Sequence, residues 1–214
     1  MEIELAGERL EMLPQRALHW AAESTLFIAD THWGKAASFR ALSIPVPVGS
    51  TTEDLERLDL ALERSGAQRL VVLGDLIHAR QGRRPETFEA VKRWLDRKPD
   101  LELWLVRGNH DRAAGDPPEE WNFRIVDEPH ALGPFALRHR PGAHERAVHS
   151  LRTYPSETSR ARLWGRIDQG AVFPIEQRVA HTPHLQQLRR RGLISRKTGE
   201  RYFVVAADEV LEAP

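Results

Sequence analysis

The amino-acid sequence predicts an α/β fold, in which helices cover the strands of a sheet. Over the first 140 residues, short apolar runs of strand length alternate with stretches whose apolar residues recur at helical spacing. Helix start and stop signals separate these runs, and such alternation is typical of α/β layer architectures. The length of 214 residues and the apolar content of 41% fit one domain with a buried core. We therefore expect a single domain over residues 1–214.

The predicted elements follow one another along the chain. The expected strands are the apolar runs at residues 26–29, 70–73, 101–106 and 135–137. A first helix is expected to begin at the capping box formed by Ser50 and Glu53 and to stop at Gly66. A second helix over residues 88–95 is expected to end before Pro99.

The composition excludes several classes of protein. With no cysteine, the chain has no disulfide, no cysteine-bound zinc and no thiol nucleophile, so a metal would need His, Asp, Glu or Asn ligands. No apolar stretch reaches the roughly 18 residues of a transmembrane helix. The acidic residues that follow the first methionine do not resemble a signal peptide. We expect a cytoplasmic protein with no membrane partner.

Each predicted strand is followed by side chains that can bind a metal ion. They are Asp30 and His32 after the first run, Asp75 after the second, Asn109, His110 and Asp111 after the third, and His139 after the fourth. In α/β sheets, ligands bind beyond the carboxyl ends of the strands. If the four strands belong to one sheet, these side chains converge on one small region.

The residue types in this set suit a pair of divalent ions. Asp30 and His32 are two residues apart, so on an extended strand end they point the same way and can chelate one ion. Asp75 adds a second carboxylate, Asn109 an amide oxygen and His139 a second imidazole. If one carboxylate were shared between two ions, the ions would lie roughly 3.5–4 Å apart, a spacing that produces hydroxide at neutral pH and polarises a phosphoryl oxygen.

His110 and Asp111 are the candidate catalytic pair. A histidine oriented by a neighbouring aspartate is suited to protonate a leaving alkoxide as a general acid. Each motif alone also has an ordinary structural explanation, since Gly-Asp pairs are mostly turns and single histidines are mostly surface or core residues. Their joint occurrence, with one motif at each strand end, favours the metal site.

The same residues resemble the first four sequence blocks of the calcineurin-like metallophosphoesterases. The blocks are Asp30-x-His32, Gly74-Asp75, residues 108–111 and His139. Within that family, residues 29–40, 44–47, 73–80 and 106–112 are most similar to the ligase-associated DNA damage response endonucleases of the PdeM group. The likeness covers residues 1–144 and returns at 199–210.

The resemblance implies an α/β/β/α sandwich of two mixed sheets, and hydrolysis of phosphate esters with DNA as the expected substrate. It also implies a functional association with a DNA ligase or helicase system, and two divalent ions, Mn²⁺ first, with Fe, Zn and Mg as alternatives. By family roles, Asp30 and His32 bind one ion, Asp75 bridges, Asn109 and His139 bind the other, and His110 is the acid. Candidate substrate-binding residues are His78, Arg112 and Lys35.

The family's fifth block, Gly-His-x-His, has no counterpart after His139. Residues 145–198 do not resemble the family and are basic, and residues 138–201 hold 14 Lys and Arg against 5 Asp and Glu. Residues 150–157 can be encoded by codons that give Ala-Cys-Gly-His-Ile-His-Pro when the reading frame is shifted by one base. In the same frame, codons for 182–189 give Leu-Pro-Thr-Phe-Asn-Ser-Phe-Gly, which resembles another family segment. We hypothesise that two compensating indels place residues 145–198 out of frame, leaving that stretch poorly ordered and the enzyme impaired.

The C-terminal segment also supports an alternative function. Residues 184–204 superficially resemble the last helix and wing of a winged-helix DNA-binding domain, with an arginine-rich loop that could contact phosphates. On that interpretation the protein is a non-catalytic nucleic-acid-binding protein. Hydrolysis that depends on Mn²⁺ and on Asp75 distinguishes the enzyme from the binding protein.

Overall fold

The structure is a computed structural model of the chain. It describes residues 1–41 and 50–139 and, as strands only, residues 149–151, 161–168, 171–173, 201–206 and 209–212. Side chains are described for residues 1–40 and 51–139.

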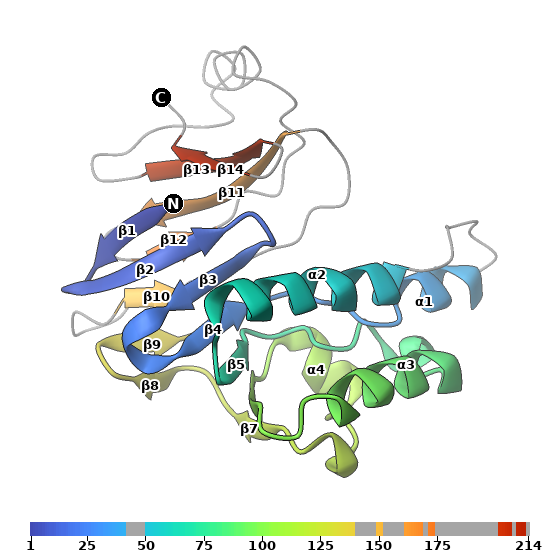
Figure 1. The fold of residues 1–214 in the computed structure, drawn as a ribbon. Coiled ribbons are helices and arrows are strands. Elements are labelled where there is room, and N and C mark those ends of the chain that lie inside the picture. The colour runs from blue at the N-terminus through green and yellow to red at the C-terminus, as the bar shows by residue number, and fades with distance from the viewer. Residues whose placement is uncertain are drawn as a thin grey trace.

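A seven-stranded mixed sheet forms the centre of the fold (Figure 1). Its strands lie in chain order: β1 (Glu2–Leu5), β2 (Glu8–Leu13), β3 (Ala17–Trp20), β4 (Thr25–Ile28), β5 (Arg69–Val72), β6 (Glu102–Val106) and β7 (Arg124–Val126). The first four strands pair antiparallel, and β4 to β7 pair parallel. The carboxyl ends of β4, β5 and β6 therefore lie side by side at one end of the sheet, where ligands bind in α/β folds.

Helices cover one face of this sheet (Figure 1). They are α1 (Lys35–Ala41), α2 (Ser50–Ser65), α3 (Pro85–Asp96) and α4 (Asn109–Ala114), with short 3-10 turns η1 (Ala21–Glu23), η2 (Arg80–Gly82) and η3 (Glu119–Trp121). Successive strand residues face opposite sides, so Leu26 and Ile28 of β4 pack with the helices and Phe27 packs on the other face. Burial on both faces explains the uninterrupted apolar run of β4.

A second layer of strands lies on the opposite face. Strands β8 (His130–Leu132), β9 (Phe135–Leu137) and β10 (His149–Leu151) form a three-stranded sheet, and β11 (Ala161–Asp168), β12 (Ala171–Phe173), β13 (Arg201–Ala206) and β14 (Glu209–Glu212) form a four-stranded one. Phe135 and Leu137 of β9 share one apolar core with Phe27, Val71 and Val106 of the central sheet. The predicted α/β fold with packed sheets is therefore confirmed.

The two predicted helices are also confirmed, as α2 and α3. Helix α2 ends one residue before Gly66, whose φ of +62° belongs to the left-handed region that favours glycine at a helix end. The antiparallel strands β1 to β3 are not among the predicted elements, because short runs that mix charged and apolar residues give only a weak alternating pattern.

One prediction about the sheet is wrong. The apolar run at 135–137 does form a strand, β9, but β9 belongs to the second sheet, where it pairs antiparallel with β8 and parallel with β10. His139 therefore reaches the site from the opposite layer. The reason is that residues 127–139 turn back across the face of the central sheet and bury Phe135 and Leu137 against it.

Several predictions fall on residues that the structure does not describe. Residues 184–200 of the winged-helix-like segment lie outside the described residues. The second helical layer of the expected α/β/β/α sandwich is likewise not among the described elements. Within residues 145–198, the described part consists of β10, β11 and β12. Among the helices that are described, none combines the length and the apolar character needed to cross a membrane.

Candidate metal centre

Three loops at the carboxyl ends of β4, β5 and β6 form the floor of the site. The N–H of Asp30 donates to the carbonyl of Gly74 (3.0 Å), and the N–H of His32 donates to the carbonyl of Asp75 (2.9 Å). Asp30, His32 and Asp75 have left-handed backbones, with φ of +51°, +44° and +57°. Strained residues of this kind concentrate at functional sites. Asp30 and His32 are thus not extended as predicted, yet Nε2 of His32 still lies 3.9 Å from Oδ1 of Asp30.

Asp111 joins two of these loops. Its buried carboxylate accepts hydrogen bonds from the backbone N–H groups of Asp75 (2.7 Å), Leu76 (2.9 Å) and Gly108 (2.8 Å). Burial raises the pKa of Asp111, and the three N–H donors act in the opposite direction. This differs from the expectation that Asp111 orients the ring of His110, since the carboxylate holds the backbone instead.

Gly74 and Gly108 leave the space that the neighbouring side chains occupy. A Cβ on Gly74, whose φ is +84°, would lie 2.4 Å from Nδ1 of His139. A Cβ on Gly108 would lie 2.3 Å from Oδ1 of Asp75. A side chain at either position would displace a predicted metal ligand, which is the physical reason for glycine before Asp75 and before Asn109.

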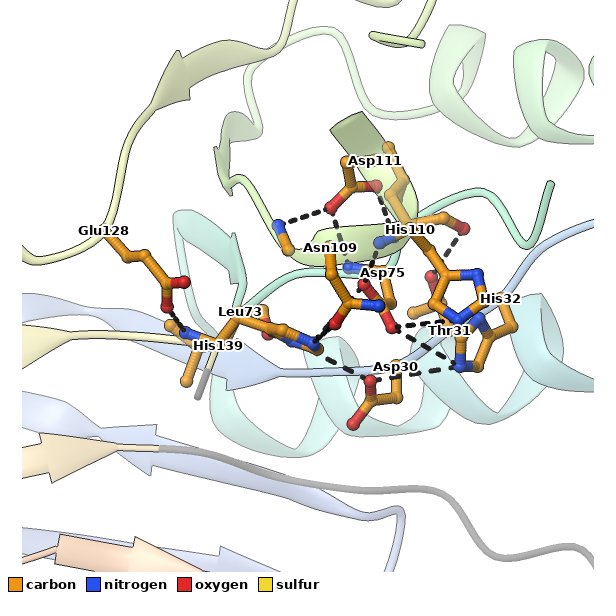
Figure 2. Close-up of polar contacts among 12 residues, drawn as sticks. Asp30, Thr31, His32, Leu73, Asp75, Asn109, His110, Asp111, Glu128 and His139 are labelled. Carbon is orange, nitrogen blue, oxygen red and sulfur yellow. Dashed lines mark hydrogen bonds and ion pairs between the residues drawn. The ribbon is translucent and has the colours of Figure 1, made fainter. Parts of the chain in front are cut away.

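The carboxylate of Asp75 lies between two sets of donor atoms (Figure 2). Its Oδ2 is 3.8 Å from Nε2 of His32, the nitrogen that also faces Asp30. Its Oδ1 is 3.4 Å from Nε2 of His139, which lies 3.0 Å from Oδ1 of Asn109. Two donors that bind one ion at about 2.1 Å can be at most about 4.2 Å apart, so these distances are compatible with one ion in each set. The structure thus brings the five predicted ligands together around Asp75, and Asp30 also lies near His139, with its Oδ1 3.9 Å from Nδ1.

The backbone of Leu73 determines which ring nitrogen of His139 faces the site. Nδ1 of His139 lies 3.0 Å from the carbonyl oxygen of Leu73, which can only accept, so Nδ1 carries the proton. Nε2 of the neutral ring is then a lone pair, and it faces the oxygens of Asn109 and Asp75 although the side chain is only 2% exposed. A metal ion among these three atoms would bind the lone pair of each.

A group of three histidines lies on the other side of Asp75. The rings of His32, His78 and His110 have centroids 5.0–5.4 Å apart. Nδ1 of His110 donates to the carbonyl of His78 at 2.7 Å, which leaves its Nε2, 3.9 Å from Oδ2 of Asp75, for proton transfer. Burial, helped by the charges that His78 and His110 can carry, lowers the pKa of His32 to about 3. The imidazole of His32 is therefore neutral at pH 7, as a metal ligand must be.

The three candidate substrate-binding residues have different surroundings. His78 belongs to the histidine group. Lys35 is the first residue of α1, and its charge contributes to the low pKa of His32. Arg112 forms an ion pair with the exposed Asp127 at 3.6 Å. The structure brings His78 and Lys35 close to the predicted ligands and engages Arg112 with a carboxylate.

Two contacts at the site are missing from the sequence-based predictions. The carboxylate of Glu128 accepts a hydrogen bond from the backbone N–H of His139 (2.8 Å), and the carbonyl of Leu73 fixes the His139 ring. A backbone carbonyl leaves no mark in a sequence. Glu128 belongs to no motif, and only the fold shows that it lies against His139.

The comparisons with known proteins agree with the fold and the donor set. The family model of the calcineurin-like phosphoesterases matches residues 24–193, so the likeness extends into residues 145–193, contrary to the expectation that it stops at residue 144. The crystal structure of Pseudomonas putida nuclease MPE is similar to the chain, with a TM-score of 0.74 and 29% sequence identity over 99% of each chain. No curated protein sequence matches the chain.

Proposed function

Because this chain belongs to the calcineurin-like phosphoesterase family, whose members are metal-dependent hydrolases of phosphate esters, we propose that it is a nuclease that cleaves phosphodiester bonds of DNA. The observation that carries the proposal is the position of Asp75, whose two carboxylate oxygens face different donor sets. The similarity to a nuclease over nearly the whole chain favours a nucleic acid among the possible phosphate esters.

The finer parts of the proposal rest on the resemblance of residues 29–40 and 106–112 to the PdeM group. They are Mn²⁺ as the metal, a cytoplasmic location and a role in DNA repair beside a ligase or helicase system. The nitrogen and oxygen donors of the site, which include no sulfur, are compatible with Mn²⁺.

Five side chains would hold the two ions. Asp30 and His32 would bind one ion, Asn109 and His139 would bind the other, and Asp75 would bind both. Each ion then has three protein donors, the number typical of catalytic rather than structural sites. Two bound ions supply a nucleophile from water at neutral pH and neutralise the charge on the phosphoryl oxygens.

His110 is the proposed general acid. Its Nδ1 is engaged by the carbonyl of His78, so proton exchange is confined to Nε2. Its backbone N–H donates to Oδ1 of Asp75 at 3.0 Å, which ties the acid to the shared carboxylate. A proton on Nε2 can then be delivered to the leaving oxygen beside the metal positions. Asp111 contributes indirectly, by holding the backbone of Asp75.

The proposal is tested with the full-length protein, Mn²⁺ and two substrates, bis-p-nitrophenyl phosphate and DNA. We expect hydrolysis of both, and we expect Asp75→Ala to abolish it, because both ions lose their shared ligand. Glu56→Gln, on the exposed side of α2, is the matched control and should leave the rate unchanged. Cleavage that survives Asp75→Ala contradicts the proposal. Salt-sensitive DNA binding without hydrolysis, lost only when residues 184–201 are removed, would favour the non-catalytic alternative.

A further inference from the structure

We propose that His78 is a positioning residue that sets the tautomers of two site histidines, His32 through its ring and His110 through its backbone carbonyl. The inference rests on the proposed function, since it explains which ring nitrogen of each histidine is available to a metal ion or a substrate. In this role His78 orients the imidazoles of His32 and His110, which differs from the substrate-binding role expected from the sequence.

The backbone of His78 contacts the ring of His110. Nδ1 of His110 lies 2.7 Å from the carbonyl oxygen of His78, and a carbonyl oxygen can only accept. The proton of the neutral His110 ring is therefore on Nδ1. In the neutral ring Nε2 is then a lone pair, and it is the atom that faces Asp75.

The side chain of His78 contacts His32, whose Nδ1 lies 3.3 Å from Nδ1 of His78. A hydrogen bond between these two nitrogens requires a proton on one of them. A proton on Nε2 of His32 would find Asp30 and Asp75 only at 3.9 and 3.8 Å, too far for a hydrogen bond. A proton on Nδ1 finds an acceptor in His78. His32 therefore keeps Nε2 as a lone pair toward both carboxylates, and His78 carries its own proton on Nε2.

The position of His78 is set by the backbone as well as by packing. Its N–H donates to the carbonyl of Trp33, the residue after His32, at 3.1 Å. Its ring stacks on His110 at an interplanar angle of 20° and contacts Phe39 at a centroid distance of 5.6 Å. The segment from Asp75 to His78 thus supplies the shared carboxylate and the partners of two histidines. Partners of this kind, which orient a metal-binding histidine through its second nitrogen, strengthen metal binding.

The first test uses the unaltered full-length protein without metal, labelled with ¹⁵N. Long-range ¹H–¹⁵N spectra distinguish the protonated from the unprotonated ring nitrogen of each histidine. We expect protons on Nδ1 of His32 and His110 and on Nε2 of His78. A proton on Nε2 of His32 overturns the proposal without any variant being made.

The second test compares His78→Leu with His78→Asn, because the amide oxygen of asparagine can accept the proton of His32 and leucine cannot. We expect His78→Leu to weaken Mn²⁺ binding, measured by titration calorimetry, about 10–100-fold and to mix the tautomers of His32. His78→Asn should restore both to within a few-fold. The His110 signature should stay unchanged in both variants, since the carbonyl of residue 78 is kept.

His130→Leu is the control, because its imidazole packs against Trp104 outside the site. Wild-type Mn²⁺ affinity in His78→Leu, or an equal loss in His78→Asn, overturns the proposal. If His78→Leu does not fold, the wild-type spectrum and His78→Asn decide the question. A protein with the expected tautomers that cleaves no DNA would refute the proposed function and leave the role of His78 intact.

Discussion

The carboxylate of Asp111 accepts the backbone N–H of Asp75 at 2.7 Å, and both residues are almost fully buried. This contact holds Asp75 in its left-handed conformation, with φ at +57°. The strain of that conformation is thus offset by a charge-assisted hydrogen bond from an adjoining loop. The position of the shared metal ligand therefore depends on a residue that does not itself face the metal positions.

Asp111→Asn should destabilise the protein by about 1–3 kcal/mol, because the amide group turns one acceptor into a donor that faces a backbone N–H. Mn²⁺-dependent hydrolysis should also fall, since Asp75 loses its support. Urea unfolding and the rate on bis-p-nitrophenyl phosphate measure the two effects. Asp127→Asn is the matched control on an exposed carboxylate, and it should change stability by no more than about 0.5 kcal/mol. Equal effects of the two substitutions would contradict the role given to Asp111.

Gly74→Ala and Gly66→Ala separate backbone strain from the loss of the site. Both glycines have positive φ, but a Cβ at position 66 meets nothing within 4 Å, whereas a Cβ at position 74 meets His139. Gly66→Ala should cost about 1–2 kcal/mol of stability and leave hydrolysis unchanged. Gly74→Ala should cost more and abolish hydrolysis by displacing His139. The idea fails if Gly74→Ala keeps full activity.

Removal of divalent ions by a chelator should lower the melting temperature and stop hydrolysis, and Mn²⁺ should restore both. A ligand that binds only the folded state at 100 times its Kd adds about 2.7 kcal/mol of stability. Thermal unfolding with and without Mn²⁺ measures the shift, and Asp30→Asn should reduce it because one position loses a carboxylate. An unchanged melting temperature on addition of Mn²⁺ to the wild-type protein would count against a metal site.

The free energy of unfolding should fall as the pH drops below 6.5, and His19 should account for part of the decline. Burial lowers the pKa of His19 below 6.5, and Glu11 opposes this only in part. In the unfolded chain His19 binds a proton near pH 6.5, whereas in the folded protein it does so only at lower pH. The free energy of unfolding therefore falls from pH 6.5 down to the lowered pKa of His19 and then levels off. In urea titrations, His19→Gln should show a shallower decline over this range. Parallel curves would show that His19 plays no part.

The nucleotide sequence across codons 140–200 tests the frameshift hypothesis. We expect the +1 frame to encode Gly-His-x-His where the chain has residues 150–157. That block would give each metal position one further imidazole. A +1 frame without the block ends the hypothesis, and the two positions would then have only the three donors each that the described residues provide.

Much of the site was predictable because its chemistry is local in the sequence. Asp30 with His32, and Asn109 with His110, directly follow apolar runs, and the parallel pairing of β4, β5 and β6 brings their ends together. The sequence placed His139 at the site but did not indicate its sheet, since an apolar run of three residues does not specify the strand with which it pairs. The role of Asp111 was missed because its partners are backbone N–H groups from β5 and β6 loops, which carry no residue-specific signal.

The residue types and their order along the chain were enough to indicate the fold class, the family and the donor atoms, since strand periodicity and metal chemistry are properties of short segments. The three-dimensional arrangement was needed to show which oxygen of Asp75 faces which histidine and which ring nitrogens of His110 and His139 face backbone carbonyls. Those features arise from the carbonyls of Leu73 and His78, which are remote in sequence from His139 and His110. The first contact forms when the second sheet packs on the central one, and the second forms when β5 and β6 pair in parallel.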